Sequence, residues 1–85
     1  MYYTYILKSK IKETYYIGSC SDLTIRLDRH NSGNSRSTKA FIPWEIVYYE
    51  QYDNKMDAMK REYFIKKQKS KKYIENLINS KGRPD

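Results

Sequence analysis

Two kinds of hydrophobic pattern alternate along the chain, and each predicts a different element. Residues 2–8, 15–20 and 44–52 are rich in aromatic and β-branched residues and carry no helical stripe, so we predict three strands there. The short polar link over residues 9–14 predicts that the first two strands form an antiparallel hairpin. Gly18 marks a close backbone approach or the end of the second strand.

Three further segments carry helix signals: a capping side chain followed by apolar residues at helical spacing. Together with the strands they give the order β-β-α-β-α-α. This order predicts an α+β fold, in which helices flank a small three-stranded antiparallel sheet. The expected caps and helices are Ser21 or Asp22 for residues 23–31 with a stop near Gly33, Asn54 for residues 55–68, and Ser70 for residues 71–79.

Length and cysteine content narrow the class of protein. The 85 residues support one domain, which we place at residues 1–80, with a flexible tail over residues 81–85. The single cysteine, Cys20, excludes an intramolecular disulfide framework and a cysteine-cluster zinc site. No apolar run reaches the roughly 18 residues of a membrane span, and the N-terminus lacks the pattern of a signal peptide. We therefore expect a soluble cytoplasmic protein that does not contact a membrane.

The excess of basic residues lies in the C-terminal third. Residues 1–54 carry seven basic and six acidic residues, whereas residues 55–85 carry ten basic and four acidic residues. A net charge of +6 on so short a segment indicates a polyanionic partner, with nucleic acid the leading candidate. The alternative is a solvated, lysine-rich helix surface, and charge alone does not separate the two.

One carboxylate falls among apolar positions of the second helix. On a helical wheel Glu62 lies between Ala58 and Met59, inside the arc expected to face the sheet, where an unpaired charge is costly. Periodicity alone favours pairing with a basic residue, Arg26 included, over a metal site. Aromatic residues are expected to dock the last two helices through Tyr63 and Tyr73. The apolar set of the second helix is Met56, Ala58, Met59, Tyr63, Phe64 and Ile65.

The first helix places two polar residues beside its apolar face. Leu23, Leu27 and His30 share one narrow arc, with Arg26 at its edge. Periodicity favours a leucine-backed helix with an extended arginine and a hydrogen-bonded histidine. A nucleophile–base pair of Cys20 with His30 is the catalytic alternative, although a lone strand cysteine is more often an apolar filler.

Short motifs in a fixed order run through most of the chain, and as a set they are specific. The sequence resembles the GIY-YIG nuclease family, and most closely its small stand-alone bacterial members. It departs from the family pattern at Tyr3, where the first motif has Gly, and at Ser19, where repair-type members carry Lys. The matching residues are Tyr3-Thr4-Tyr5, Tyr16-Ile17-Gly18, Asp22-Leu23, Arg26-Leu27, His30-Asn31, Gly33, Ser37-Thr38-Lys39, Pro43-Trp44 and Ala58-Met59-Lys60-Arg61-Glu62.

The resemblance implies the GIY-YIG nuclease fold and hydrolysis of one phosphodiester bond of DNA with a single divalent cation, Mg²⁺ or Mn²⁺. It implies a catalytic group of Tyr5, Tyr16, Arg26 and His30, and Glu62 as the metal ligand. Both tyrosines are candidates for the base, with Tyr5 favoured. A phenol is a poor base at neutral pH, so we expect a nearby cation to lower its pKa.

The same resemblance implies a weakly specific or structure-selective enzyme of DNA repair or recombination, with RNA left open as a substrate. Two alternatives stand beside it. The first is a nucleic-acid-binding module with little catalysis, because Ser19 replaces a cation. The second is an interaction protein, whose sign would be a large exposed apolar patch. The basic residues expected to contact phosphates are Arg36, Lys39, Lys66, Lys67, Lys69, Lys71 and Lys72.

Overall fold

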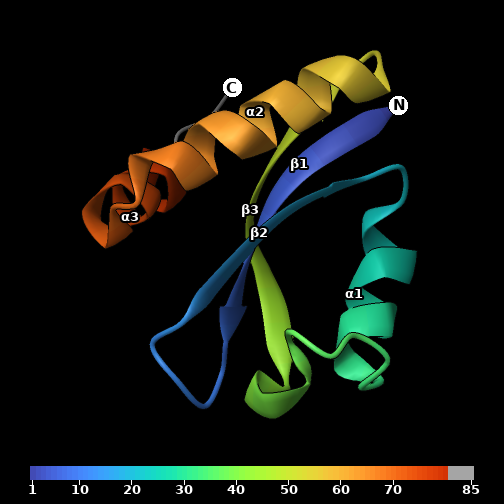
Figure 1. Ribbon diagram of the computed structural model, residues 1–85, viewed down its shortest axis with the longest axis vertical. Helices are drawn as coiled ribbons and strands as arrows, with labels where there is room; N and C mark the ends of the chain where they lie inside the picture. Colours follow the sequence, from blue (N-terminus) through green and yellow to red (C-terminus); the bar gives the residue numbers. More distant parts are fainter. Residues whose placement is uncertain (81–85) are drawn as a thin grey trace.

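A computed structural model describes residues 1–80 and confirms the predicted α+β order (Figure 1). Each strand and helix ends within one residue of its predicted bounds. One short 3-10 helix inside the polar loop was not predicted, and the tail predicted over residues 81–85 lies outside the described residues. The elements are β1 (Tyr2–Ser9), β2 (Tyr15–Cys20), α1 (Leu23–Asn31), η1 (Lys39–Phe41), β3 (Trp44–Tyr52), α2 (Lys55–Gln68) and α3 (Lys71–Ser80).

The three strands form an antiparallel sheet in the order β2-β1-β3, so β1 is the central strand. On one side β1 pairs with β2, which sets Tyr5 opposite Gly18 and Thr4 opposite Ser19. On the other side its register against β3 shifts between Ile6 and Leu7. The central strand therefore has a hydrogen-bonded neighbour along both of its edges.

Side chains that alternate along β1 divide the core into two clusters. Tyr5 and Leu7 pack with Cys20 and Trp44 against α1, whereas Ile6 packs with other side chains against α2 and α3. We call these two sides the α1 face and the α2 face of the sheet, and Figure 1 shows a helix layer on each. Both faces are covered, which is how so small a chain buries its sheet.

Capping side chains begin the three helices where the sequence predicts. Asp22 Oδ1 accepts from the Ile25 amide at 2.9 Å, and Asn54 Oδ1 accepts from the Asp57 amide at 2.9 Å. Ser70 Oγ accepts a 3.1 Å hydrogen bond from the amide of the third residue after it. Such caps satisfy amides that have no partner within the helix, so the start of each helix is encoded locally.

Helix α2 differs from the prediction in which of its apolar residues face inward. Ala58 is fully buried and Ile65 is 1% exposed, and the Ala58 carbonyl accepts a 2.7 Å hydrogen bond from Thr4 Oγ1. The prediction of one inward arc was wrong, because α2 carries two apolar stripes and the close contact with β1 admits only the one that contains small Ala58. Tyr73 docks α3 as expected, but Tyr63 is exposed and docks nothing. The outward residues are Met56, Met59, Tyr63 and Phe64.

Candidate active site

The backbone of β2 comes unusually close to the side chain of Tyr5. A Cβ atom at Gly18 would lie 2.5 Å from Tyr5 Oη and 2.7 Å from its Cζ. Tyr5 is 1% exposed and cannot turn away, so only glycine fits opposite it. The close approach marked by Gly18 in the sequence is thereby confirmed. The glycine lets the phenol of the central strand cross the neighbouring strand.

Beyond Gly18 the Tyr5 hydroxyl meets the one histidine of the chain. Tyr5 Oη lies 3.1 Å from His30 Nε2, and His30 is 3% exposed. The Tyr16 ring lies 4.9 Å from the His30 ring between centroids and 6.4 Å from the Tyr5 ring. The helical wheel predicted that His30 faces the sheet, and it does. The structure thus brings together three residues that we predicted to act jointly.

The alternative pairing of His30 with Cys20 is not formed. Both ring nitrogens of His30 have other partners, since Nδ1 lies 3.0 Å from Thr38 Oγ1 and Nε2 lies beside Tyr5 Oη. Burial raises the pKa of the Cys20 thiol, so the thiolate is disfavoured. Cys20 is a packing residue of the α1 face.

The environment holds Tyr5 protonated at neutral pH. Burial raises the pKa of its phenol well above the usual range and the nearby Tyr16 adds to this, whereas Arg26 opposes the shift by its charge and by hydrogen bonding without overcoming it. We expected a cation to lower this pKa, and the direction is the reverse because burial outweighs the guanidinium. A base function of Tyr5 therefore requires a partner that takes the phenol proton.

His30 is such a partner. Burial lowers the pKa of its imidazole, and the charges of Arg26 and Arg29 lower it further. The ring is therefore neutral at pH 7 and has one nitrogen free to accept a proton. A neutral imidazole in contact with a protonated phenol is an arrangement suited to proton transfer.

A cationic pocket opens beside this group, at the end of the sheet where α1 and α2 approach each other. Arg26 reaches it from α1 and Lys55 from the first turn of α2, and no carboxylate lines it. Two cations and the positive end of a helix suit a phosphate. Sequence reasoning did not single out Lys55, although a lysine at a helix N-terminus, where cations are disfavoured, was an available signal. The lining residues are Tyr2, Ser19, Cys20, Ser21, Arg26, Lys55 and Ala58.

Glu62 is held on the other side of β2 from the tyrosines. Its Oε1 accepts from Ser19 Oγ at 2.7 Å, and its Oε2 accepts from Lys66 Nζ at 2.6 Å. The alternative that Glu62 pairs with a basic residue is thus realised, with Lys66 in place of Arg26. Ser19 also lines the pocket, so the residue that departs from the family pattern connects the carboxylate to it.

The donor set around Glu62 fits a divalent cation held by a single carboxylate. Its two oxygens offer about four acceptor positions, of which Ser19 and Lys66 use two. Mg²⁺ prefers oxygen ligands and keeps several waters, so one carboxylate suffices. Among residues 1–80 no group of three or more His, Cys, Asp or Glu forms a denser site. Lys66 is a competitor for the carboxylate that a bound cation would displace.

The predicted phosphate contacts lie apart from this pocket. Arg36 and Lys39 are exposed on the loop around Thr38. Near the junction of α2 and α3, Lys66 is engaged by Glu62, and Lys71 approaches Glu13 at 3.9 Å. None of the seven predicted residues lines the pocket that holds Arg26. The remaining members at the junction, all exposed, are Lys67, Lys69 and Lys72.

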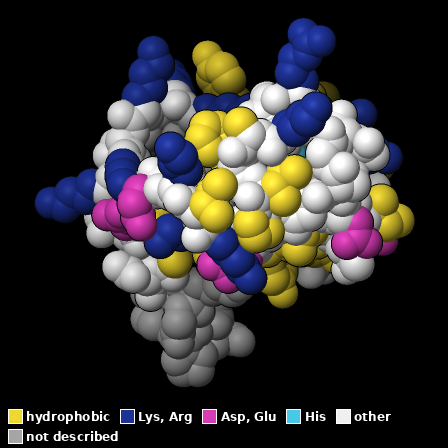
Figure 2. Space-filling model, turned by 90° about the horizontal axis from the view of Figure 1, so that it is seen from below, with side chains coloured by type: hydrophobic (Ala, Val, Ile, Leu, Met, Phe, Trp, Pro, Cys, Tyr) yellow, Lys and Arg dark blue, Asp and Glu magenta, His cyan; other side chains and the backbone are white. Residues whose placement is uncertain are grey.

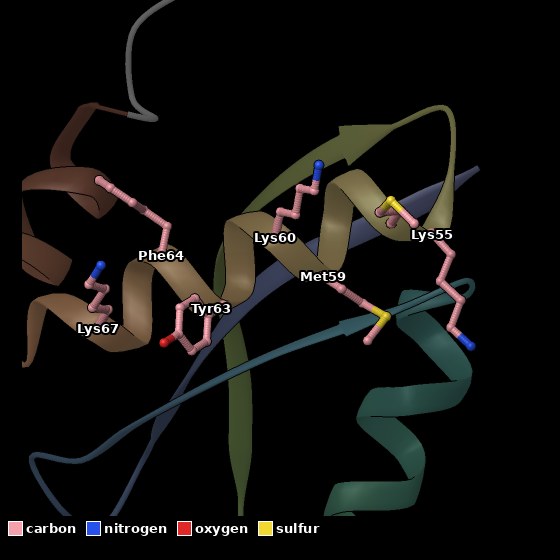
Figure 3. Close-up of a pocket in the computed structure, with 7 residues that line it drawn as sticks. Lys55, Met59, Lys60, Tyr63, Phe64 and Lys67 are labelled. Atoms are coloured by element: carbon pink, nitrogen blue, oxygen red, sulfur yellow. The ribbon is translucent and has the colours of Figure 1, made fainter.

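An exposed apolar patch runs along the outer side of α2, and we call it the α2 outer surface. Figure 3 shows its side chains projecting from α2, and Tyr63 is 69% and Met59 50% exposed. Lysines flank it, and Lys55 belongs both to this surface and to the cationic pocket. On the face of the molecule that Figure 2 shows, hydrophobic side chains likewise lie among Lys and Arg. The surface comprises Lys55, Met56, Met59, Lys60, Tyr63, Phe64 and Lys67.

Comparison with known proteins identifies relatives of similar size. Residues 1–75 match the model of the GIY-YIG catalytic domain. The chain is 40% identical over 83 residues to the UPF0213 protein CPE1444 of Clostridium perfringens, which covers 96% of this chain and 87% of the relative. It is 37% identical over 84 residues to the UPF0213 protein YazA of Bacillus subtilis, covering 94% and 84%.

A solved structure extends the comparison to three dimensions. The solution NMR structure of the UPF0213 protein BH0048 from Bacillus halodurans superposes with a TM-score of 0.59 at 32% identity, over 99% of this chain and 89% of that one. An experimental structure of a relative therefore shares the overall fold. No helix within residues 1–80 is long and apolar enough to cross a membrane.

Proposed function

The chain belongs to the GIY-YIG family, whose catalytic domain is a nuclease-type fold, and we propose that it is a divalent-cation-dependent endonuclease that cuts DNA. One observation carries the proposal. A buried phenol and a buried neutral imidazole are in hydrogen-bond contact at 3.1 Å, beside a pocket lined by Arg26 and Lys55. Neither a plain core nor a binding surface requires this pair.

Tyr5 and His30 move the proton of the attacking water. Water bonds to phosphorus as one of its protons passes to Tyr5 Oη, and the proton of Tyr5 passes to His30 Nε2. The bond from phosphorus to the leaving oxygen then breaks, and that oxygen takes a proton from solvent. The pair overcomes the high pKa of Tyr5, because the phenol gives up its own proton as it takes another.

Arg26 and Lys55 bind the phosphate. Both line the pocket, and Arg26 also lies close enough to Tyr5 to affect its pKa. A guanidinium donates two parallel hydrogen bonds to a phosphate and stabilises the extra negative charge of the transition state. Arg26 is thus near both the phosphate that is cut and Tyr5, the proposed base.

Glu62 would hold the divalent cation. Its carboxylate accepts a hydrogen bond from Ser19, which lines the pocket, and a bound cation would take the place of Lys66. A bound Mg²⁺ or Mn²⁺ would supply Lewis-acid stabilisation of charge on the phosphate and the leaving oxygen. Ser19 is neutral and adds no second positive charge beside the Glu62–Lys66 pair, so its departure from the family pattern is compatible with catalysis.

The α2 outer surface is the sign that we expected of an interaction protein, and it favours docking as a second candidate function. A nucleic acid accounts for the same surface, because bases stack on exposed aromatic rings such as Tyr63 while lysines contact phosphates. Lys55 links the surface to the pocket, so one polyanion reaches both. We therefore assign the α2 outer surface to DNA.

Replacing Glu62 by Gln tests the proposal. Gln keeps the shape but loses the charge that holds the cation, so Glu62→Gln should abolish cation-dependent cleavage in single-turnover assays on plain, flapped and branched DNA with Mg²⁺ or Mn²⁺. Its fold and DNA affinity should stay close to those of the wild type. The matched control is Glu45→Gln, at an exposed position on β3, which should cut normally.

Two results would contradict the proposal in different ways. Cleavage by Glu62→Gln at the wild-type rate would show that the metal ligand is assigned wrongly. A wild type that binds DNA but cuts none of the substrates, with both cations tested, would identify a binding module. Thermal stability with and without Mg²⁺ separates a lost cation from a lost hydrogen bond, since wild type and Glu45→Gln should gain stability from the ion and Glu62→Gln should not.

A further inference from the structure

Thr38 lies behind His30 and is completely buried. Its Oγ1 lies 3.0 Å from His30 Nδ1, on the opposite side of the ring from Tyr5. Its position does not depend on the hydroxyl, because its backbone carbonyl accepts from Trp44 Nε1 at 2.9 Å and its amide donates to the Ser35 carbonyl at 3.2 Å. The hydroxyl is therefore presented to the imidazole by a separately anchored backbone.

Matching each hydrogen-bond donor of Tyr5, His30 and Thr38 to an acceptor shows where their protons lie. In one tautomer, Nδ1–H donates to Thr38 Oγ1, whose own hydrogen points to the Ser35 carbonyl in a long contact of 3.5 Å. Nε2 is then bare and accepts the Tyr5 hydroxyl hydrogen. Every buried donor in the chain of groups has an acceptor.

The other tautomer leaves one donor stranded. If Nε2 carried the hydrogen, it would donate to Tyr5 Oη, and the Thr38 hydroxyl would donate to Nδ1. The hydroxyl hydrogen of buried Tyr5 would then have no acceptor among the hydrogen bonds of the described residues. Arg26, which also approaches Tyr5, can only donate. A buried donor without an acceptor costs about 1–3 kcal/mol.

From this accounting we propose that Thr38 is a positioning residue, which holds His30 as the Nδ1–H tautomer and so leaves Nε2 bare to take the Tyr5 proton. The inference rests on the proposed function only where it assigns a purpose to the tautomer. Thr38 does not touch the substrate. It acts through His30, as the outer hydrogen-bond partner of a catalytic imidazole sets which nitrogen reacts.

The tautomer can be read directly, because His30 is the only histidine. In a ¹⁵N spectrum that correlates ring nitrogens with ring protons, a protonated nitrogen and a bare one resonate in well-separated regions. At a pH where the ring is neutral, the wild-type spectrum should show the proton on Nδ1. A proton on Nε2 in the wild type would overturn the proposal without any variant or activity.

Two variants then test whether the Thr38 hydroxyl is responsible. Thr38→Val keeps the shape and removes the acceptor, so the ring should shift toward the Nε2–H form and kcat should fall on the order of 10²-fold. Thr38→Ser restores a hydroxyl and should recover both the wild-type tautomer and most of kcat. Retention of the Nδ1–H form in Thr38→Val would overturn the proposal, and so would a Thr38→Ser variant that behaves like Thr38→Val. If Thr38→Val does not fold, the wild-type and Thr38→Ser spectra still decide.

Failure of the proposed function gives a different result. If the wild type cuts no DNA yet shows the Nδ1–H tautomer, and that tautomer is lost in Thr38→Val, then the control of His30 by Thr38 stands and the nuclease assignment does not.

Discussion

The two faces of the sheet differ in where their polar groups lie. On the α1 face a line of hydrogen-bonded groups, Tyr5, His30 and Thr38, lies inside the protein and is at most 3% exposed. On the α2 face the interior is apolar around Ile6 and Ile65, and charged groups stand at the rim. The α1 face therefore carries the buried Tyr5–His30 pair, whereas the interior of the α2 face supplies packing and only the exposed parts of α2 contribute Glu62 and Lys55 to the candidate site. Adjacent residues of one strand serve the two purposes, because successive side chains point to opposite sides.

Charged groups at the rim of the α2 face attach helix α2 to the sheet. Glu50 of β3 receives two hydrogen bonds from Arg61 of α2, at 2.9 and 3.1 Å, and further ones from Tyr48 and Tyr52. Burial raises the pKa of the Glu50 carboxyl, but these donors together outweigh it and the net shift is downward. Every polar group of the cluster is paired, so it ties α2 to the sheet and leaves no reactive group. The Tyr5–His30 pair differs in that a protonated phenol contacts a neutral imidazole, the contact through which we propose that a proton passes.

The largest expected effect on stability follows from opening the α2 face. Ile65→Ala removes most of a side chain that is 1% exposed at the contact of α2 with the sheet, so the free energy of unfolding should fall by about 2–5 kcal/mol. Urea denaturation measures this, with Ile25→Ala as the matched control, because Ile25 is 59% exposed. DNA cleavage per folded molecule should be unchanged. A loss of cleavage in Ile65→Ala molecules that remain folded would mean that the packing of α2 on the sheet also sets the positions of Glu62 and Lys55.

A smaller effect should follow from closing the gap beneath Tyr5. Gly18→Ala places a methyl group where only 2.5 Å separates it from Tyr5 Oη, so Tyr5 must shift and the free energy of unfolding should fall by about 1–3 kcal/mol. The Tyr5–His30 hydrogen bond should weaken, which a change in the His30 ring spectrum would show.

A double-mutant cycle sharpens this prediction. In a Tyr5→Leu background the clashing hydroxyl is gone, so most of the penalty of Gly18→Ala should disappear. A penalty that is the same in both backgrounds would show that the glycine serves backbone conformation and not the phenol.

The smallest effect on stability belongs to the outward stripe of α2. Tyr63→Ala removes a ring that is 69% exposed, so the free energy of unfolding should change by no more than about 0.5 kcal/mol. The same variant should bind DNA more weakly, and the loss should be larger for DNA with unpaired bases than for plain duplex. Fluorescence anisotropy at two salt concentrations measures both. Unchanged affinity for every DNA would instead favour a role of the α2 outer surface in binding another protein.

Much of this protein was determined by local sequence. Strand composition and the caps Asp22, Asn54 and Ser70 predicted the order of elements, because caps and β-branched or aromatic runs act within a few residues. The sheet-facing arc of Leu23, Leu27 and His30 was likewise predicted, since one helix face was clearly apolar. The family resemblance pointed to Tyr5, Tyr16, Arg26, His30 and Glu62 as the candidate site, and their roles stay a prediction.

Only the tertiary structure decided the rest. Helix α2 has two apolar stripes, and contact with Thr4 of β1 selected the one that contains Ala58, a choice that periodicity cannot make. The pKa of Tyr5 moved upward against expectation, because burial by distant parts of the chain outweighs a nearby cation. The roles proposed for Thr38 and Lys55 also depend on the folded structure. Thr38 contacts His30 eight residues away across an irregular loop, and Lys55 shares a pocket with Arg26 of another helix. Neither contact follows from the periodicity of a single helix or strand.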